Sequence, residues 1–269
     1  MRTLFAAVMA VLTFSSLGWA QAWNHNPDSR IGPLHWGNVT PSYATCGDSK
    51  TGEVGMKQSP IDIVPDNALA ASFSALLFNY NPIPLKIENT GHYVEVLYDP
   101  GSSLSVGSQP TDGYQLVQFH FHAPSEHTIN GVQYAAELHL VHTNDIGEIA
   151  VIGVLLSSSE EGLPIFDTIM DNSPTTSTPP GNEVELSEEV NVFDLLPFRK
   201  GFYRYAGSLT TPACSESVQW FLMQDPVPIT RDAVKKLHSL ITLFPNYRGY
   251  PNNNRPVADQ NGRSVLKSN

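Results

Sequence analysis

Short alternating segments dominate the chain. Hydrophobic and polar residues alternate between turn-forming residues at 92–98, 114–122, 134–142, 148–156 and 217–223. A period of two is typical of strands that bury one face. One stretch has the helical period instead, because "TRDAVKKLHSLITLF" predicts a helix that Thr230 caps and Pro245 ends. The pattern therefore predicts a β-rich protein with few helices.

No repeat or Gly-Ser linker divides the rest of the chain, so we expect a single domain. The stretch 157–189 is rich in Ser, Thr, Pro and acidic residues and contains the apolar segment "LPIFDTIM". This composition predicts a surface loop around one short helix.

The first 22 residues have the features of a secretory signal peptide. A single cation, Arg2, precedes an apolar run, and small residues end in Ala20-Gln21-Ala22. We therefore expect a mature domain over residues 23–269, secreted or periplasmic. No later stretch offers eighteen uninterrupted apolar residues, so no membrane span is predicted.

Charge and cysteine content narrow the function classes. The formal net charge is −11, and an acidic surface repels phosphate backbones, which argues against nucleic-acid binding. The two cysteines, Cys46 and Cys214, lie in a chain expected to cross an oxidising compartment. One disulfide is the favoured interpretation, and two free buried thiols are the alternative.

Three histidines are placed to converge. On the strand "YQLVQFHFH", the period of two gives one face the residues Leu116, Gln118, His120 and His122, and the other face Val117, Phe119 and Phe121. On "AELHLVH", the corresponding sets are Glu137, His139 and Val141 against Leu138, Leu140 and His142. If the two strands pair as a hairpin, His139 comes opposite His120 and His122.

Three neutral imidazoles would bind a zinc ion and leave its fourth position open, which is the catalytic type of zinc site. Gln118 and Glu137 each precede a candidate ligand by two residues, so each can hold that imidazole's second nitrogen. A lone His-x-His in a strand is more often structural. A cupin-like site with Glu126 as a ligand is a further alternative, in which iron or manganese would be plausible.

A set of short motifs resembles the α-class carbonic anhydrases. The motifs occur in that family's order from about Trp23 to Val265: "GPLHW" (32–36), "QSPIDI" (58–63), "TGHYVEV" (90–96), "QFHFH" (118–122), "SEHT" (125–128), "YAAELHLVH" (134–142), "GSLTTP" (207–212), "SVQW" (217–220) and "NNRPV" (253–257). Any one of them is a weak signal, but the ordered set is specific.

The resemblance implies an α+β fold, with a large, twisted, mainly antiparallel sheet and short peripheral helices. It implies that His120, His122 and His139 bind zinc, and that Gln118, Glu137 and the backbone near Asn253 hold these histidines. The implied reaction is the reversible hydration of carbon dioxide by zinc-bound hydroxide, with a side esterase activity. Sulfonamides and anions are the implied inhibitors, and the oligomeric state is not indicated.

The resemblance also assigns the remaining site residues. Thr210 would orient the hydroxide and donate to Glu126, since a carboxylate only accepts. His92 would carry the proton to solvent. The substrate pocket would be formed by Val141, Val151, Leu209, Thr211 and Trp220, although each of the apolar residues is also typical of core. A Cys46–Cys214 disulfide would brace the loop that carries Thr210.

The chain departs from the family pattern at several positions, of which two lie close to the expected site. Ala213 follows Pro212 where a second proline is usual, so we expect a cis bond there to be costly and the turn to differ. His25 stands where the family usually has a tyrosine near the solvent network. A related binding protein that has lost catalysis is the alternative function, but such proteins typically lack a ligand histidine, and all three are present here.

Overall fold

The structure, a computed structural model, describes residues 22–47, 55–107, 113–179 and 181–268. The expected signal peptide, residues 1–22, lies outside this range except for Ala22. In the described part of the chain, no helix has the length and apolar character needed to cross a membrane.

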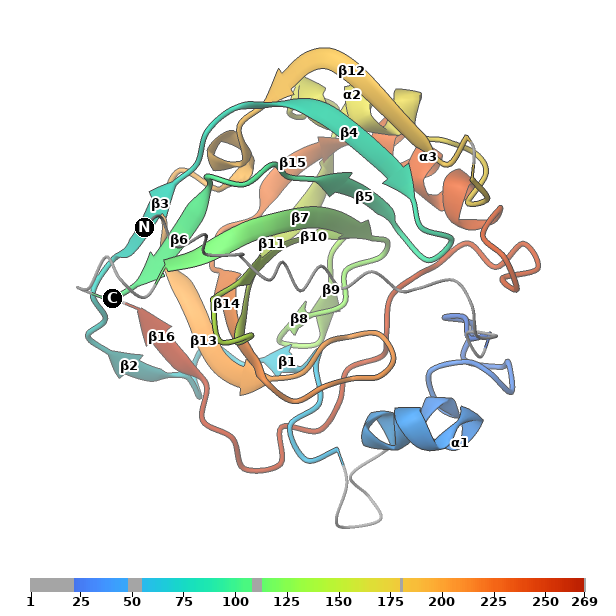
Figure 1. Cartoon of the computed structure of the whole chain (residues 1–269). Coiled ribbons are helices and arrows are strands. Elements are labelled where there is room, and N and C mark those ends of the chain that lie inside the picture. Colours follow the sequence, from blue (N-terminus) through green and yellow to red (C-terminus); the bar gives the residue numbers. More distant parts are fainter. Residues whose placement is uncertain (1–21, 48–54, 108–112, 180, 269) are drawn as a thin grey trace, which may run out of the picture.

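Among the described residues, thirteen strands form one large twisted sheet (Figure 1). Ten follow one another across it: β12 (Glu183–Val190), β4 (Ile83–Asn89), β5 (Val94–Leu97), β7 (Gly113–His122), β10 (Ala136–Thr143), β11 (Ile149–Ser159), β14 (Val218–Met223), β13 (Phe202–Gly207), β16 (Leu266–Ser268) and β2 (Leu69–Ala71). The others are β3 (Leu76–Asn79), β6 (Ser103–Val106) and β15 (Val227–Thr230). Most neighbours are antiparallel, and the predicted fold class is confirmed.

The helices are short and peripheral. They are α1 (Trp36–Val39), α2 (Pro164–Asn172) and α3 (Arg231–Ile241), with 3-10 helices at Pro41–Cys46 and Val192–Leu195. A small separate sheet joins β1 (Asp62–Ile63), β8 (Thr128–Ile129) and β9 (Val132–Gln133). At the start of α3 the Thr230 hydroxyl accepts from the Ala233 N–H at 3.1 Å, so the predicted cap is confirmed.

The central strands separate two different environments. On one face, Phe121 and Leu140 belong to the main apolar core, to which α2 and α3 contribute Phe166 and Leu237. The opposite face of the same strands carries the histidines. The apolar face therefore anchors the strands that position the polar site.

Strands β7 and β10 pair antiparallel, and His139 lies directly opposite His120, as the hairpin predicted. The register then shifts: Val141 pairs with Gln118, but His142 pairs with Leu116. This β-bulge adds one residue to β7 and reverses the alternation. The prediction that Leu116 shares the histidine face is therefore wrong, because Leu116 joins the apolar core and Val117 is 42% exposed.

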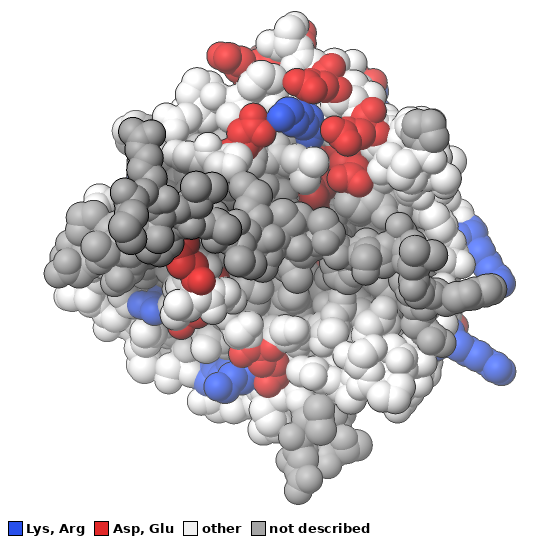
Figure 2. Space-filling view, viewed as in Figure 1, with Lys and Arg blue, Asp and Glu red and all other residues white. Residues whose placement is uncertain are grey.

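The stretch 157–189 is only partly the predicted loop. The short helix is present as α2, but β12 is a strand at the sheet edge, with a register shift between Glu185 and Glu189. Its exposed glutamates are Glu183, Glu185, Glu188 and Glu189. In Figure 2, acidic side chains gather over this part of the molecule. Charges along an edge strand oppose pairing with a second chain, which explains why this strand lacks the usual strand composition.

Candidate metal centre

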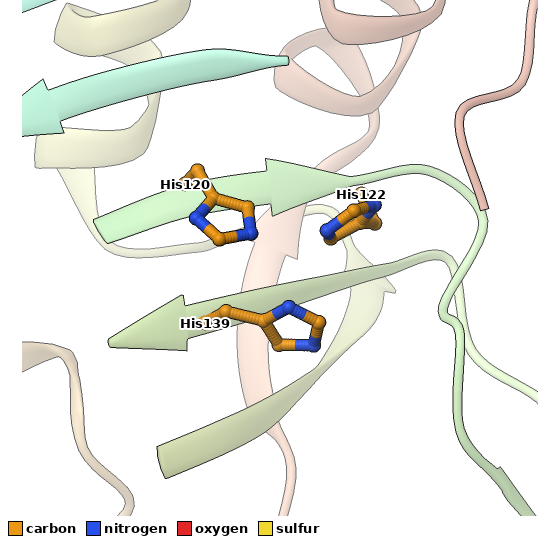
Figure 3. A group of neighbouring side chains, drawn as sticks. All are labelled: His120, His122 and His139. Atoms are coloured by element: carbon orange, nitrogen blue, oxygen red, sulfur yellow. The ribbon is translucent and has the colours of Figure 1, made fainter. Parts of the chain in front are cut away.

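Three imidazoles converge from two neighbouring strands (Figure 3). His120 and His122 project from β7, and His139 projects from β10. Their ring centroids are 4.7–5.2 Å apart, and one ring nitrogen from each lies within 4.8 Å of the other two. The hairpin register is the cause, because it places His139 opposite His120 and one step from His122.

Each of the three rings is oriented by an oxygen acceptor. The nitrogens that donate are His120 Nδ1 to Gln118 Oε1 at 2.8 Å, His122 Nδ1 to the Asn253 carbonyl at 2.8 Å, and His139 Nε2 to Glu137 Oε1 at 2.9 Å. Since each acceptor oxygen holds the proton on that nitrogen, the other ring nitrogen keeps a free lone pair. The free atoms are His120 Nε2, His122 Nε2 and His139 Nδ1, and they form the convergent set.

The environment keeps these rings neutral. Burial lowers the pKa of His120 well below its ordinary value, and His122 and His139 lower it further. Burial also lowers the pKa of His122 to about 4. His122 Nε2 is buried and has no hydrogen-bond partner among the described residues. Three neutral nitrogen donors, one of them otherwise orphaned, fit a zinc ion with an open fourth position.

Glu137 links the site to the core. Its Oε1 accepts from His139 and also from His127 Nδ1 at 2.6 Å, while its Oε2 accepts from the backbone N–H groups of Glu126 and His127. Burial alone would raise the pKa of Glu137, but His127 and His139 together hold it well below its ordinary value. Glu137 is therefore a fixed carboxylate, and His127 has a supporting hydrogen-bond role.

Glu126 and Thr210 lie together beside the histidines. Glu126 Oε1 accepts from the Arg255 backbone N–H at 2.8 Å, and both side chains of the pair are buried. Burial raises the pKa of Glu126 to about 7, while His139, the Thr210 hydroxyl and the Arg255 N–H favour its charged form. The hydroxyl and carboxyl that sequence reasoning paired thus meet in space.

A disulfide braces the loop that carries Thr210. Cys46 and Cys214 are bonded, with an S–S distance of 2.05 Å and 168 residues between them in sequence. The predicted disulfide is therefore confirmed. The Pro212–Ala213 peptide bond in the same loop is cis, so the expectation against a cis bond was wrong.

His92 is half-buried rather than freely exposed. Its ring stacks on Trp23 with centroids 3.6 Å apart, and its Nδ1 has no partner in the described part of the chain. Burial lowers the pKa of His92 to about 4. The neighbouring Tyr93 stacks on His120 at 4.5 Å. Sequence reasoning found neither aromatic contact, because nothing in a single sequence pairs Trp23 with a residue so far along the chain.

An apolar surface lies beside the imidazoles. The expected pocket residues Val141, Val151, Leu209 and Trp220 belong to one hydrophobic cluster, and the Trp220 ring lies 4.8 Å from that of His139. Thr211, the fifth, is half-buried on the loop after Thr210. The ring contact between Trp220 and His139 therefore places this apolar cluster directly beside the imidazoles.

Comparisons with known proteins agree with this geometry. The family model for eukaryotic-type carbonic anhydrase matches residues 31–269. A carbonic anhydrase of Nostoc sp. is 35% identical over 89% of this chain and 84% of its own length. A carbonic anhydrase of Klebsiella pneumoniae is 31% identical over 97% of this chain and 97% of its own length.

Solved structures are similar over most of their length. The α-carbonic anhydrase of Thermovibrio ammonificans, in complex with the inhibitor sulfanilamide, has a TM-score of 0.79 at 34% identity and covers 91% of this chain and 99% of its own. Dioscorin complexed with ascorbate has a TM-score of 0.76 at 28% identity. The match covers 91% of this chain and 97% of the dioscorin chain.

Proposed function

This chain belongs to the eukaryotic-type carbonic anhydrase family, and we propose that it hydrates carbon dioxide at a zinc ion bound by His120, His122 and His139. The observation that carries the proposal is the set of three free lone pairs, each fixed by a hydrogen bond at the ring's other nitrogen. Family membership removes the cupin alternative. Glu126 is accordingly not a ligand in this three-histidine set.

A bound zinc ion would act as a Lewis acid and lower the pKa of its water to about 7, a value for which carbonic anhydrase is itself the reference case. The protein's own groups then orient the reactants. Because Glu126 as a carboxylate can only accept, it directs the Thr210 proton toward itself and leaves the Thr210 oxygen to accept from the attacking oxygen. Val141, Val151, Leu209, Thr211 and Trp220 would hold carbon dioxide.

His92 is the proposed carrier of the released proton, because it is a half-buried imidazole whose Nδ1 has no hydrogen-bond partner among the residues that the structure describes. Its lowered pKa favours release of the proton to buffer over its capture. A side esterase activity is expected of the same site, since activated esters also present a carbonyl carbon for attack. Sulfanilamide binds the Thermovibrio ammonificans relative, and we expect sulfonamides and anions to inhibit this protein too.

The mature protein is proposed to be one domain over residues 23–269, secreted or periplasmic. The Cys46–Cys214 disulfide supports this location, because such bonds persist in oxidising compartments. Mass spectrometry of the secreted protein would test it. An N-terminus near Trp23 is expected, and secretion with residues 1–22 retained would contradict it.

The function is tested with zinc content and carbon dioxide hydration measured on the same preparations. We expect one zinc per chain, activity that chelation abolishes, and background activity in His139→Ala. His238→Ala is the matched control, because His238 lies half-buried on α3 and its ring bonds the Pro251 carbonyl. Full activity in His139→Ala, or wild-type protein that keeps zinc without hydrating carbon dioxide, would overturn the proposal. The latter result would identify a binding protein.

A further inference from the structure

A fourth histidine lies inside the site. His25, which replaces the tyrosine usual in the family, is only 1% exposed. Its ring contacts Trp36 at 5.4 Å and His122 at 6.3 Å between centroids, and its Nδ1 is hydrogen-bonded to the Tyr247 hydroxyl. His25 is therefore held by a partner 222 residues away and faces a metal ligand.

Three buried polar atoms meet beside His25 with no hydrogen-bond partner in the described residues. They are His25 Nε2, His122 Nε2 and Glu126 Oε2. His25, His122 and Glu126 each offer one ligand atom within 4.8 Å of the other two, and His122 Nε2 is 3.5 Å from Glu126 Oε2. Burying polar atoms without partners is unfavourable, so a ligand that satisfies all three at once would be strongly preferred.

In each of these residues the second polar atom is already engaged. His25 Nδ1 bonds the Tyr247 hydroxyl, His122 Nδ1 donates to the Asn253 carbonyl at 2.8 Å, and Glu126 Oε1 accepts from the Arg255 N–H at 2.8 Å. One atom fixed and one atom free is the arrangement that orients metal ligands. The same arrangement occurs in the three-histidine set, and His122 belongs to both sets.

The donor chemistry suits a divalent transition metal. Two imidazoles and a carboxylate form a zinc-binding set, with bonds of about 2.0–2.2 Å, so donor atoms on a tetrahedral ion lie roughly 3.3 Å apart. The 3.5 Å separation of His122 Nε2 and Glu126 Oε2 is close to that value. The carboxylate also brings a negative charge that the three-histidine set lacks.

We propose that His25, His122 and Glu126 form a second, alternate position for a divalent metal ion, overlapping the three-histidine position. The two positions are mutually exclusive, because His122 Nε2 has a single lone pair. An ion in the second position reaches the first by exchanging His25 and Glu126 for His120 and His139 while it stays bound to His122. The second position is thus a loading site. This role does not depend on which reaction takes place at the first position.

The charge of Arg255 makes the loading site the weaker of the two. Its guanidinium is anchored to the Ser59 and Cys46 carbonyls at 2.8 and 3.2 Å. The guanidinium lies over the Trp36 ring, 5.5 Å from its centroid, and the His25 ring lies 5.4 Å from the same ring, so the charge of Arg255 is close to His25. A nearby cation opposes a second one, so the metal passes through this position and rests at the three histidines.

The first test isolates the loading site. In His120→Ala/His139→Ala the main site keeps only one ligand, whereas the loading site keeps all three. We expect this double variant to bind one Co²⁺ or Zn²⁺ per chain at least tenfold more tightly than the triple variant that adds His25→Ala, as measured by calorimetry. Equal affinity in the two variants, or no binding by either while circular dichroism shows both folded, would overturn the proposal.

The second test uses the otherwise intact protein, so that it does not depend on the multiple variants folding. We expect His25→Ala to slow zinc uptake by the apoprotein and zinc release to dipicolinate by the same factor, about tenfold. Removing an intermediate changes both rates but not the final equilibrium. His238→Ala is the control. Unchanged rates in His25→Ala would contradict the proposal, and neither test uses carbon dioxide hydration, so the proposed function can fail separately.

Discussion

The two faces of β7 and β10 show how one pair of strands serves two purposes. On the apolar face, Phe121 and Leu140 pack into a core shared with α2 and α3, where many contacts each contribute a little. On the polar face, His120 and His139 each depend on one named acceptor. Substitutions on the first face should therefore change stability, and substitutions on the second should change metal binding.

The largest expected effect is on the apolar face. Phe121 is fully buried, and its ring lies 6.0 Å from Phe119 and 5.9 Å from Phe166. We expect Phe121→Ala to lower the free energy of unfolding by about 3–5 kcal/mol, because it leaves a cavity. Urea denaturation measures the change. Val117→Ala on the same strand is the control, and a loss for Phe121→Ala no larger than the control's would break the distinction between the faces.

His142 is the polar exception on the apolar face. It bonds the Tyr80 hydroxyl at 2.8 Å and the Ala150 carbonyl at 3.3 Å, and burial lowers its pKa to about 4. The unfolded chain takes up this proton below about pH 6.5, whereas the folded protein resists it until about pH 4. Stability is therefore lost as the pH falls through that window, by about 3 kcal/mol from this group.

The acid effect is measured by denaturant unfolding at pH 7 and pH 4.5. Other buried histidines add to the wild-type loss, so the informative quantity is the difference from His142→Gln, which has no imidazole to titrate. We expect the variant to lose about 2–3 kcal/mol less than the wild type over this range. Equal losses would show that folding does not lower the pKa of His142.

The smallest effect is expected on the polar face. Gln118→Ala removes the acceptor that orients His120, which should weaken zinc binding about 10–100-fold. That range corresponds to about 1.4–2.7 kcal/mol of binding free energy. Competition with a chelator measures it. Gln118→Glu keeps an acceptor oxygen and should restore most of the affinity, and Gln115→Ala, exposed on the same strand, should have no effect. A lower free energy of unfolding for Gln118→Ala, with unchanged zinc affinity, would contradict the expected difference between the two faces.

Local patterns predicted a β-rich protein and a hairpin that brings His139 opposite His120 and His122, whereas the α+β fold class was implied by the family resemblance. They failed where the structure depends on one inserted residue or on a contact between residues far apart in the sequence. The bulge at Val117 reverses the side-chain alternation, and a strict period of two therefore misplaced Leu116. The burial of His25 depends on Tyr247, which no local pattern connects to it. The acidic edge strand β12 has the composition of a loop, so composition misassigned it.

The disulfide divides the described chain into a covalent ring and two tails. Residues 46–214 form the ring, and they include His120, His122 and His139. His25 lies on the N-terminal tail and Asn253 on the C-terminal tail, and each tail reaches the site only through non-covalent contacts. A protease cut within the ring leaves both fragments joined until a reductant is added. A cut in either tail frees a piece at once, so limited proteolysis can detach a tail while all three histidines remain in one linked molecule.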